Sequence, residues 1–191
     1  MTKNRLEAFS DGVLAIIITI MVLELRAPEG ADLASLRPLA PVFVSYALSF
    51  VYLAIYWNNH HHMLQAAERV NGSILWANMH LLFWLSLIPF STAWLGRHEF
   101  SIWPVVLYGV LLLLAAIAYY ILARLLAAHH GRDSTLAKAL GGDRKGKISI
   151  AIYAAAIVLA FFSSRLAYAL YAAVALMWLY PDRRFEKALS L

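Results

Sequence analysis

The 191-residue chain contains no cysteine, and only 14% of its residues are charged. The lack of cysteine excludes disulfides, thiolate catalysis and cysteine-ligated zinc or iron–sulfur sites. Soluble domains carry about 25% charged and 45–50% apolar residues, whereas this chain is 62% hydrophobic. The composition therefore excludes a soluble enzyme and predicts an integral membrane protein. The net charge of +5 reflects loop placement in such a protein, so we expect no nucleic-acid partner.

Charged residues and Pro/Gly clusters divide the chain into six apolar segments. We predict an all-α, polytopic membrane protein, one unit of six transmembrane helices over residues 1–191. The segments are 5–25, 41–64, 71–95, 101–127, 148–164 and 166–180. The last two are short, and we expect a helical hairpin around Arg165 rather than one long helix, because a single charge at mid-membrane is costly. The stretch 129–147 is expected to be a solvent loop or a short surface helix.

The distribution of Lys and Arg predicts the orientation. If both termini lie on one side, that side holds 12 basic residues and the other holds four: Arg26, Arg37, Arg97 and Arg165. Cytoplasmic loops are enriched in basic residues. We therefore expect a multi-pass protein of the cell (inner) membrane with both termini in the cytoplasm. Glu7 and Asp11 lie where a signal peptide would be basic, so the first apolar run is not expected to be one.

The first segment carries several polar side chains that a bilayer should exclude, namely Arg5, Glu7, Ser10, Asp11 and Thr19. At the same depth the second segment ends in the run 57–63, and the third begins with Trp76, Asn78 and His80. We expect a hydrogen-bonded layer that satisfies these groups together. Its expected members are Arg5, Phe9, Ser10, Asp11, Trp57, His60, Trp76 and His80. Three consecutive histidines on a helix point about 100° apart and cannot converge on one ion, so no metal site is expected.

The run Arg5-Leu6-Glu7-Ala8-Phe9-Ser10-Asp11 resembles the R-x-x-x-F-S-D signature of the transmembrane protein 175 family, the endo-lysosomal potassium channels and their prokaryotic relatives. The resemblance covers the whole chain. Prokaryotic family members of this length form tetramers, and the likeness implies a central pore lined by the first helix of each subunit. It also implies an apolar constriction five residues past the aspartate, at Ile16, and a threonine three residues further, at Thr19.

The helical wheel is consistent with this arrangement. Gly12, Thr19, Ile20 and Leu23 lie within about 60° of Ile16, and Asp11 lies about 140° away. Such a stripe could also pack or face lipid, and the pattern alone leaves that open. With the resemblance, we expect pore rings at Ile16, Ile20 and Leu23, with Thr19 contributing to selectivity. Arg5, Ser10 and Asp11 are expected to hold the fold rather than conduct.

The sequence thus predicts a homotetrameric, potassium-permeable cation channel with no T-V-G-Y-G carbonyl filter. Its partners would be further copies of the chain, potassium and other monovalent cations, and the lipid bilayer. It would need no cofactor, and potassium would be the permeant ion. Two alternatives stay open at this point. One is a membrane-embedded, metal-dependent enzyme using Asp11, His60 and His80, and the other is a proton-coupled transporter of small substrates using an Asp/His pair.

Overall fold

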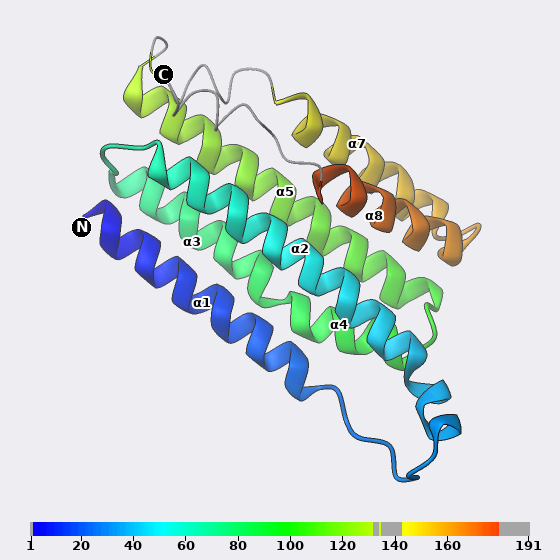
Figure 1. Ribbon diagram of the computed structural model, residues 1–191. Helices are drawn as coiled ribbons and strands as arrows, with labels where there is room; N and C mark the ends of the chain where they lie inside the picture. Colours follow the sequence, from blue (N-terminus) through cyan, green and yellow to red (C-terminus); the bar gives the residue numbers. More distant parts are fainter. Residues whose placement is uncertain (1, 132–133, 135–142, 180–191) are drawn as a thin grey trace.

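The computed structural model describes residues 2–131, 134 and 143–179. Within these residues every regular element is helical, which confirms the all-α prediction (Figure 1). The helices are α1 (Lys3–Leu23), the 3-10 helix η1 (Leu33–Leu39), α2 (Ala40–Gln65), α3 (Gly72–Ser86), α4 (Ile88–Arg97), α5 (Ile102–His130), α7 (Arg144–Leu159) and α8 (Ser164–Leu179).

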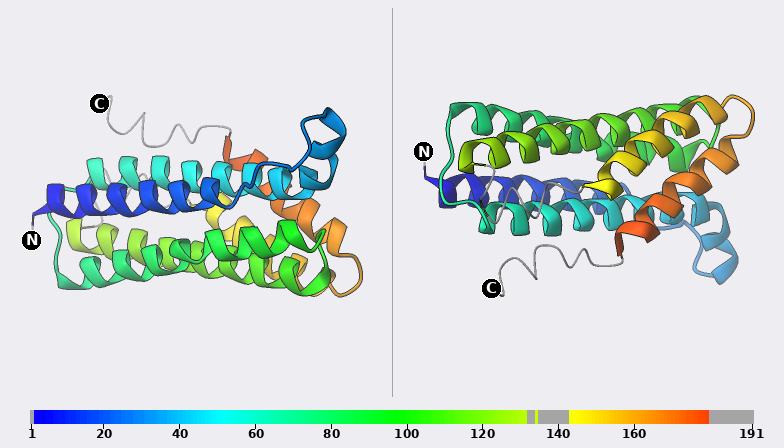
Figure 2. Two further views of the ribbon diagram at one scale, coloured as in Figure 1. Left: turned by 90° about the horizontal axis from the view of Figure 1, so that it is seen from below. Right: turned by 90° about the horizontal axis from the view of Figure 1, so that it is seen from above.

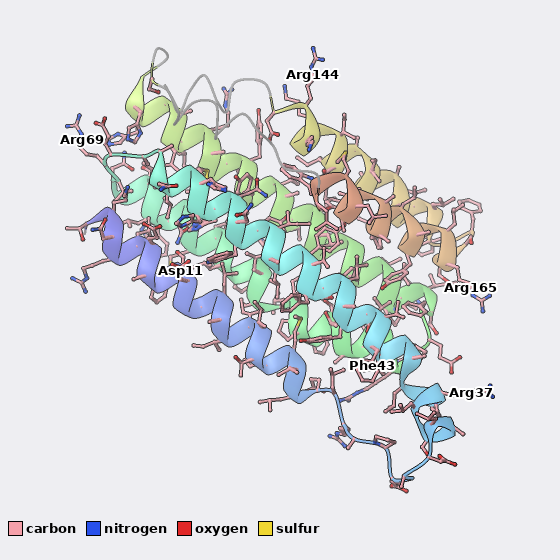
Figure 3. The ribbon with its side chains drawn as sticks, in the orientation of Figure 1. Asp11, Arg37, Phe43, Arg69, Arg144 and Arg165 are labelled. Carbon is pink, nitrogen blue, oxygen red and sulfur yellow. The ribbon has the colours of Figure 1, made fainter. Side chains whose placement is uncertain are left out.

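Among the described residues, four helical stretches are long and apolar enough to cross a membrane: Lys3–Leu23, Leu33–Gln65, Gly72–Arg97 and Ile102–His130. The helices α7 and α8 have 16 residues each, or about 24 Å at the helical rise. They run antiparallel as the predicted hairpin, and Arg165 projects from the end of α8 that follows the turn (Figure 3). The alternative of one long helix is therefore wrong.

The third apolar segment, predicted as continuous, is interrupted at Leu87 between α3 and α4. Pro89 follows in the first turn of α4. Proline has no backbone N–H, so it cannot donate the helical hydrogen bond to the carbonyl four residues earlier, and its ring disfavours a continuous helix there. The interruption lies well inside the stretch that is long enough to span the membrane.

The helices form an elongated bundle in which α1 packs against α2, α3 and α4. Seen from two opposite sides, α1 lies at one surface of the bundle and the α7–α8 hairpin at the other (Figure 2). The hairpin packs on α5 and α2. The N-terminus and the end of α5 lie at one end of the bundle together with Arg69, and Arg37 and Arg165 lie at the other end (Figures 1 and 3).

The predicted polar stretch 129–147 is only partly described. His129 and His130 form the last turn of α5, and Arg144 begins α7. Residues 132–133 and 135–142 of this stretch lie outside the described residues.

Hydrogen bonds from buried tyrosine hydroxyls join the α7–α8 hairpin to the bundle. Tyr52 of α2 donates to the backbone carbonyl of Tyr171 in α8 at 2.6 Å, and Tyr153 of α7 donates to the Tyr52 hydroxyl at 3.1 Å. All three side chains are buried. The Tyr171 hydroxyl donates to the backbone carbonyl of Val105 at 3.4 Å. Each hydroxyl therefore has a partner, as a polar group in an apolar interior requires.

Gly109 of α5 gives a test of this packing. A Cβ at this position would lie 2.0 Å from the hydroxyl oxygen of Tyr171 and 2.6 Å from the ring carbon that carries it. Because Tyr171 is fully buried, it cannot swing away at low cost. Gly109→Ala should lower the free energy of unfolding by about 1–3 kcal/mol, measured by thermal unfolding in detergent. Gly72→Ala is the control, because nothing lies within 4 Å of the added carbon.

Candidate functional site

The helix α1 presents two different faces. Leu6, Ser10, Leu14, Ile17 and Met21 recur at helical spacing and are buried against the bundle. The opposite face carries the predicted stripe, which we define as Gly12, Ile16, Thr19, Ile20 and Leu23. All five residues are exposed in the single chain, with Ile16 exposed by 60% and Leu23 by 75%. An apolar surface along the length of α1 thus remains uncovered in one copy of the chain.

Behind this stripe lies a buried chain of hydrogen bonds through Asn78 of α3. His60 of α2 approaches the amide oxygen of Asn78 at 2.7 Å, and the amide nitrogen of Asn78 donates to the Ser10 hydroxyl at 2.9 Å. Ser10 donates in turn to the backbone carbonyl of Leu6 at 2.8 Å. All three side chains are at most 2% exposed. We name these three residues, Ser10, His60 and Asn78, the polar chain.

The polar chain has one consistent direction. An amide oxygen only accepts hydrogen bonds, so His60 donates from Nε2. Every bond then runs from α2 through α3 to α1 and ends on a backbone carbonyl. The other ring nitrogen of His60, Nδ1, is buried without a hydrogen-bond partner among the described residues, which fits a tautomer carrying its hydrogen on Nε2.

Two further contacts, less buried than the polar chain, join α1 to α2 beside it. The indole of Trp57 donates to a carboxylate oxygen of Asp11 at 3.0 Å, and Asp11 lies on the side of α1 that faces the bundle (Figure 3). One turn toward the N-terminus, Nδ1 of His61 and a carboxylate oxygen of Glu7 lie at hydrogen-bond distance, 3.1 Å apart. The rings of Trp57 and His61 stack with centroids 6.0 Å apart. Asp11 therefore contacts a neighbouring helix and not the stripe.

Four predicted members of the polar layer lie elsewhere in the single chain. Arg5, Phe9 and Trp76 are exposed, with Trp76 exposed by 78%. His80 accepts a hydrogen bond from Trp84 within α3 at 2.8 Å. The prediction placed Trp76 and His80 at the depth of Asp11, but each of them is two positions from Asn78, or about 200° around the helix. They therefore face away from the polar chain.

The prediction does not include Asn78 among the expected members of the polar layer. A signal for it exists, because Asn78 shares its helical face with Ile74, Leu81, Leu82 and Leu85, all of which are buried. A polar residue in register with an apolar stripe faces the interior and needs partners there. Depth alone could not separate it from Trp76 and His80.

Thr19 has a specific arrangement on the stripe. Its hydroxyl donates to the backbone carbonyl of Ala15 at 2.8 Å, so its hydrogen points back along α1. The oxygen lone pairs are then left for an outside partner. Thr19 therefore presents an acceptor oxygen on a surface that is otherwise apolar.

Comparisons with known proteins identify the family. The family described as "Endosomal/lysosomal potassium channel TMEM175" matches residues 5–89. A relative from Chryseobacterium sp. (strain P1-3), named a potassium channel, is 55% identical over 190 residues, covering 100% of this chain and 99% of the relative. The chain belongs to the TMEM175 family.

Structural and more distant similarity agree with this assignment to the TMEM175 family. The crystal structure of a lysosomal potassium-selective channel TMEM175 homolog from Chamaesiphon minutus is similar, with a TM-score of 0.80, 26% identity and coverage of 93% of this chain and 96% of that chain. The human endosomal/lysosomal proton channel TMEM175 is 32% identical over an alignment of 87 residues that covers 38% of this chain and 17% of the human protein.

The TMEM175 family is one of channels, so the chain is not an enzyme. The geometry also gives no support to the alternatives that used Asp11 with histidines. Asp11 binds Trp57, His60 binds Asn78 and His80 binds Trp84, each separately. Among the described residues, no three His, Cys, Asp or Glu side chains lie close enough to hold a metal ion.

The hydrogen bonds of the polar chain predict that Asn78 contributes more to the free energy of unfolding than an exposed asparagine does. Asn78→Leu keeps the approximate volume but leaves the buried Nε2–H of His60 without its acceptor and removes the hydrogen bond that the Ser10 hydroxyl accepts, at about 1–3 kcal/mol for each group. Thermal unfolding in detergent should show a lower midpoint for Asn78→Leu. Asn58→Leu on α2 is the matched control, because Asn58 is exposed and should tolerate the change. An equal loss in both variants would contradict the central role of Asn78.

Proposed function

We propose that this protein is a homotetrameric potassium channel of the cell membrane, with a central pore lined by the exposed face of α1. Its relatives from Chryseobacterium sp., Streptomyces collinus and Chamaesiphon minutus are named potassium channels. In the proposed orientation both termini are cytoplasmic, as the placement of the basic residues favours. Potassium and other monovalent cations are the permeant ions, and no cofactor takes part.

The observation that carries the proposal is the contrast between the two faces of α1. One face is fixed against the bundle by the polar chain and by buried apolar residues, whereas the stripe is exposed in the described part of the single chain. Four copies arranged around an axis would cover this stripe by bringing the four α1 helices together. The small residue Gly12 lies on the same face, where nothing lies within 4 Å of an added Cβ.

In this arrangement Ile16 forms the narrowest ring of the pore, and Ile20 and Leu23 form further apolar rings. A ring of branched apolar side chains excludes water, and an ion entering it loses hydration without replacement. Thr19, one turn beyond Ile16, offers the acceptor oxygens described above. Potassium releases its hydration water more readily than sodium, so an apolar ring beside hydroxyl oxygens favours potassium, though less strongly than a carbonyl filter.

Asp11, Ser10 and the other contacts between α1 and α2 have a structural role in this proposal. They lie on the side of α1 away from the stripe, where they set its position. Arg5, Phe9, Trp76 and His80 are exposed in the single chain and lie on surfaces that assembly or lipid would cover.

The first test is the mass of the assembly. Purified protein in mild detergent should give the mass of four copies by native mass spectrometry or light scattering. A stable monomer or dimer that still conducts potassium in liposomes would contradict the central pore.

The second test uses potassium and sodium flux in liposomes. Ile16→Asn should keep the constriction hydrated, raise flux several-fold and reduce the preference for potassium, whereas Thr19→Ala should mainly reduce that preference. Val22→Asn is the control, because Val22 is an exposed residue of the same helix about 120° from Ile16. If Ile16→Asn and Val22→Asn both leave flux unchanged, Ile16 faces lipid and not the pore.

A further inference from the structure

The end of α1 opposite the N-terminus carries an ion pair with α4. Glu24 directly follows the last residue of α1, and Arg97 is the last residue of α4. A guanidinium nitrogen of Arg97 donates to a carboxylate oxygen of Glu24. Both side chains keep about half of their surface exposed, at 53% for Arg97 and 42% for Glu24. The charges are therefore paired but remain accessible to solvent and ions.

This pair lines an open cleft shared with the proposed pore stripe. The cleft has a volume of about 560 Å3 and lies between α1 and α4. It is lined by Glu24, Arg97 and the stripe residue Ile20, together with the aromatic side chains of Phe90 and Trp94. Because Ile20 contributes to both surfaces, the pair is adjacent to the face of α1 that we assign to the pore. Four copies of Glu24 would then surround one end of that pore.

We propose that Glu24 attracts permeant cations to this entrance of the channel and that Arg97 both positions its carboxylate and limits the attraction. The inference rests on the proposed function, since it needs α1 to line the pore. Acidic rings at pore entrances raise the local concentration of cations. An adjacent arginine offsets much of that field, so the strength of attraction depends on the balance within the pair.

The two halves of the pair should therefore have opposite effects when neutralised. Glu24→Gln leaves the positive charge of Arg97 at the entrance, which repels cations. Arg97→Gln leaves the negative charge of Glu24, which attracts them more strongly. If the pair served only to tie α1 to α4, both substitutions would act in the same direction, because either one breaks the tie.

Single-channel conductance in planar bilayers at 10 mM and 1 M KCl separates these cases. At 10 mM the Debye length is about 30 Å, and at 1 M it is about 3 Å. Glu24→Gln should lower conductance at 10 mM by about two- to fivefold, Arg97→Gln should raise it, and both effects should vanish at 1 M. Glu29→Gln is the matched control, because Glu29 is exposed five residues further along the chain.

A charge exchange keeps the proposal testable if the single variants assemble poorly. The double variant Glu24→Arg with Arg97→Glu retains an ion pair between α1 and α4 but places the positive charge on α1. It should assemble like the wild type and conduct less at 10 mM KCl, with no difference at 1 M.

The outcomes distinguish this proposal from the proposed function. A wild-type protein that carries no potassium current overturns both. A wild type that conducts, with Glu24→Gln and Arg97→Gln lowering conductance equally at both salt concentrations, overturns only the proposal for this ion pair. The same holds if neither substitution changes the conductance at 10 mM.

Discussion

A buried amide in a membrane protein must find partners on both its donor and its acceptor side, and Asn78 finds them on two different helices. Its oxygen accepts from His60 of α2 and its nitrogen donates to Ser10 of α1. This requirement fixes more than the distance between helices. A rotation of α1 by one residue would move Ser10 by about 100° and break its hydrogen bond with Asn78. The polar chain therefore sets which face of α1 points outward.

The proposed pore depends on that rotation. The stripe containing Ile16 and Thr19 lies outside because Ser10 is held inside, and the contacts of Asp11 with Trp57 and of Glu7 with His61 add to the same constraint. The proposed pore face of α1 is apolar apart from Thr19, whereas Glu7, Ser10 and Asp11 lie on the side that contacts the bundle. In the proposed channel, selectivity thus depends on residues that the R-x-x-x-F-S-D run positions but does not contain.

The sequence was sufficient for features that follow from long runs of one kind of residue. The six predicted apolar segments are helical in the structure, and Arg165 lies beside the turn between α7 and α8. Within the described residues, four helical stretches are long and apolar enough to span a membrane, whereas α7 and α8 are shorter. Features that depend on packing between distant segments could not be predicted from the sequence in the same way. Depth could be estimated for Trp76, Asn78 and His80, but the rotation of α3 decides that only Asn78 faces inward. The pairing of Glu24 with Arg97 likewise depends on how α1 packs against α4, which no local pattern contains.

The short α7–α8 hairpin has a consequence for the surrounding lipid. Each of its helices is about 6 Å shorter than a hydrocarbon core of about 30 Å, and the hairpin covers only the part of the bundle away from the N-terminus (Figure 1). A hydrophobic stretch shorter than the bilayer makes the adjacent leaflet thin or the flanking polar side chains extend toward the headgroups. The perimeter of the protein is therefore uneven in hydrophobic thickness, and the elastic energy stored in the adjoining lipid varies with acyl-chain length. A membrane of shorter chains would relieve that deformation beside α7 and α8 while leaving the longer helices to tilt.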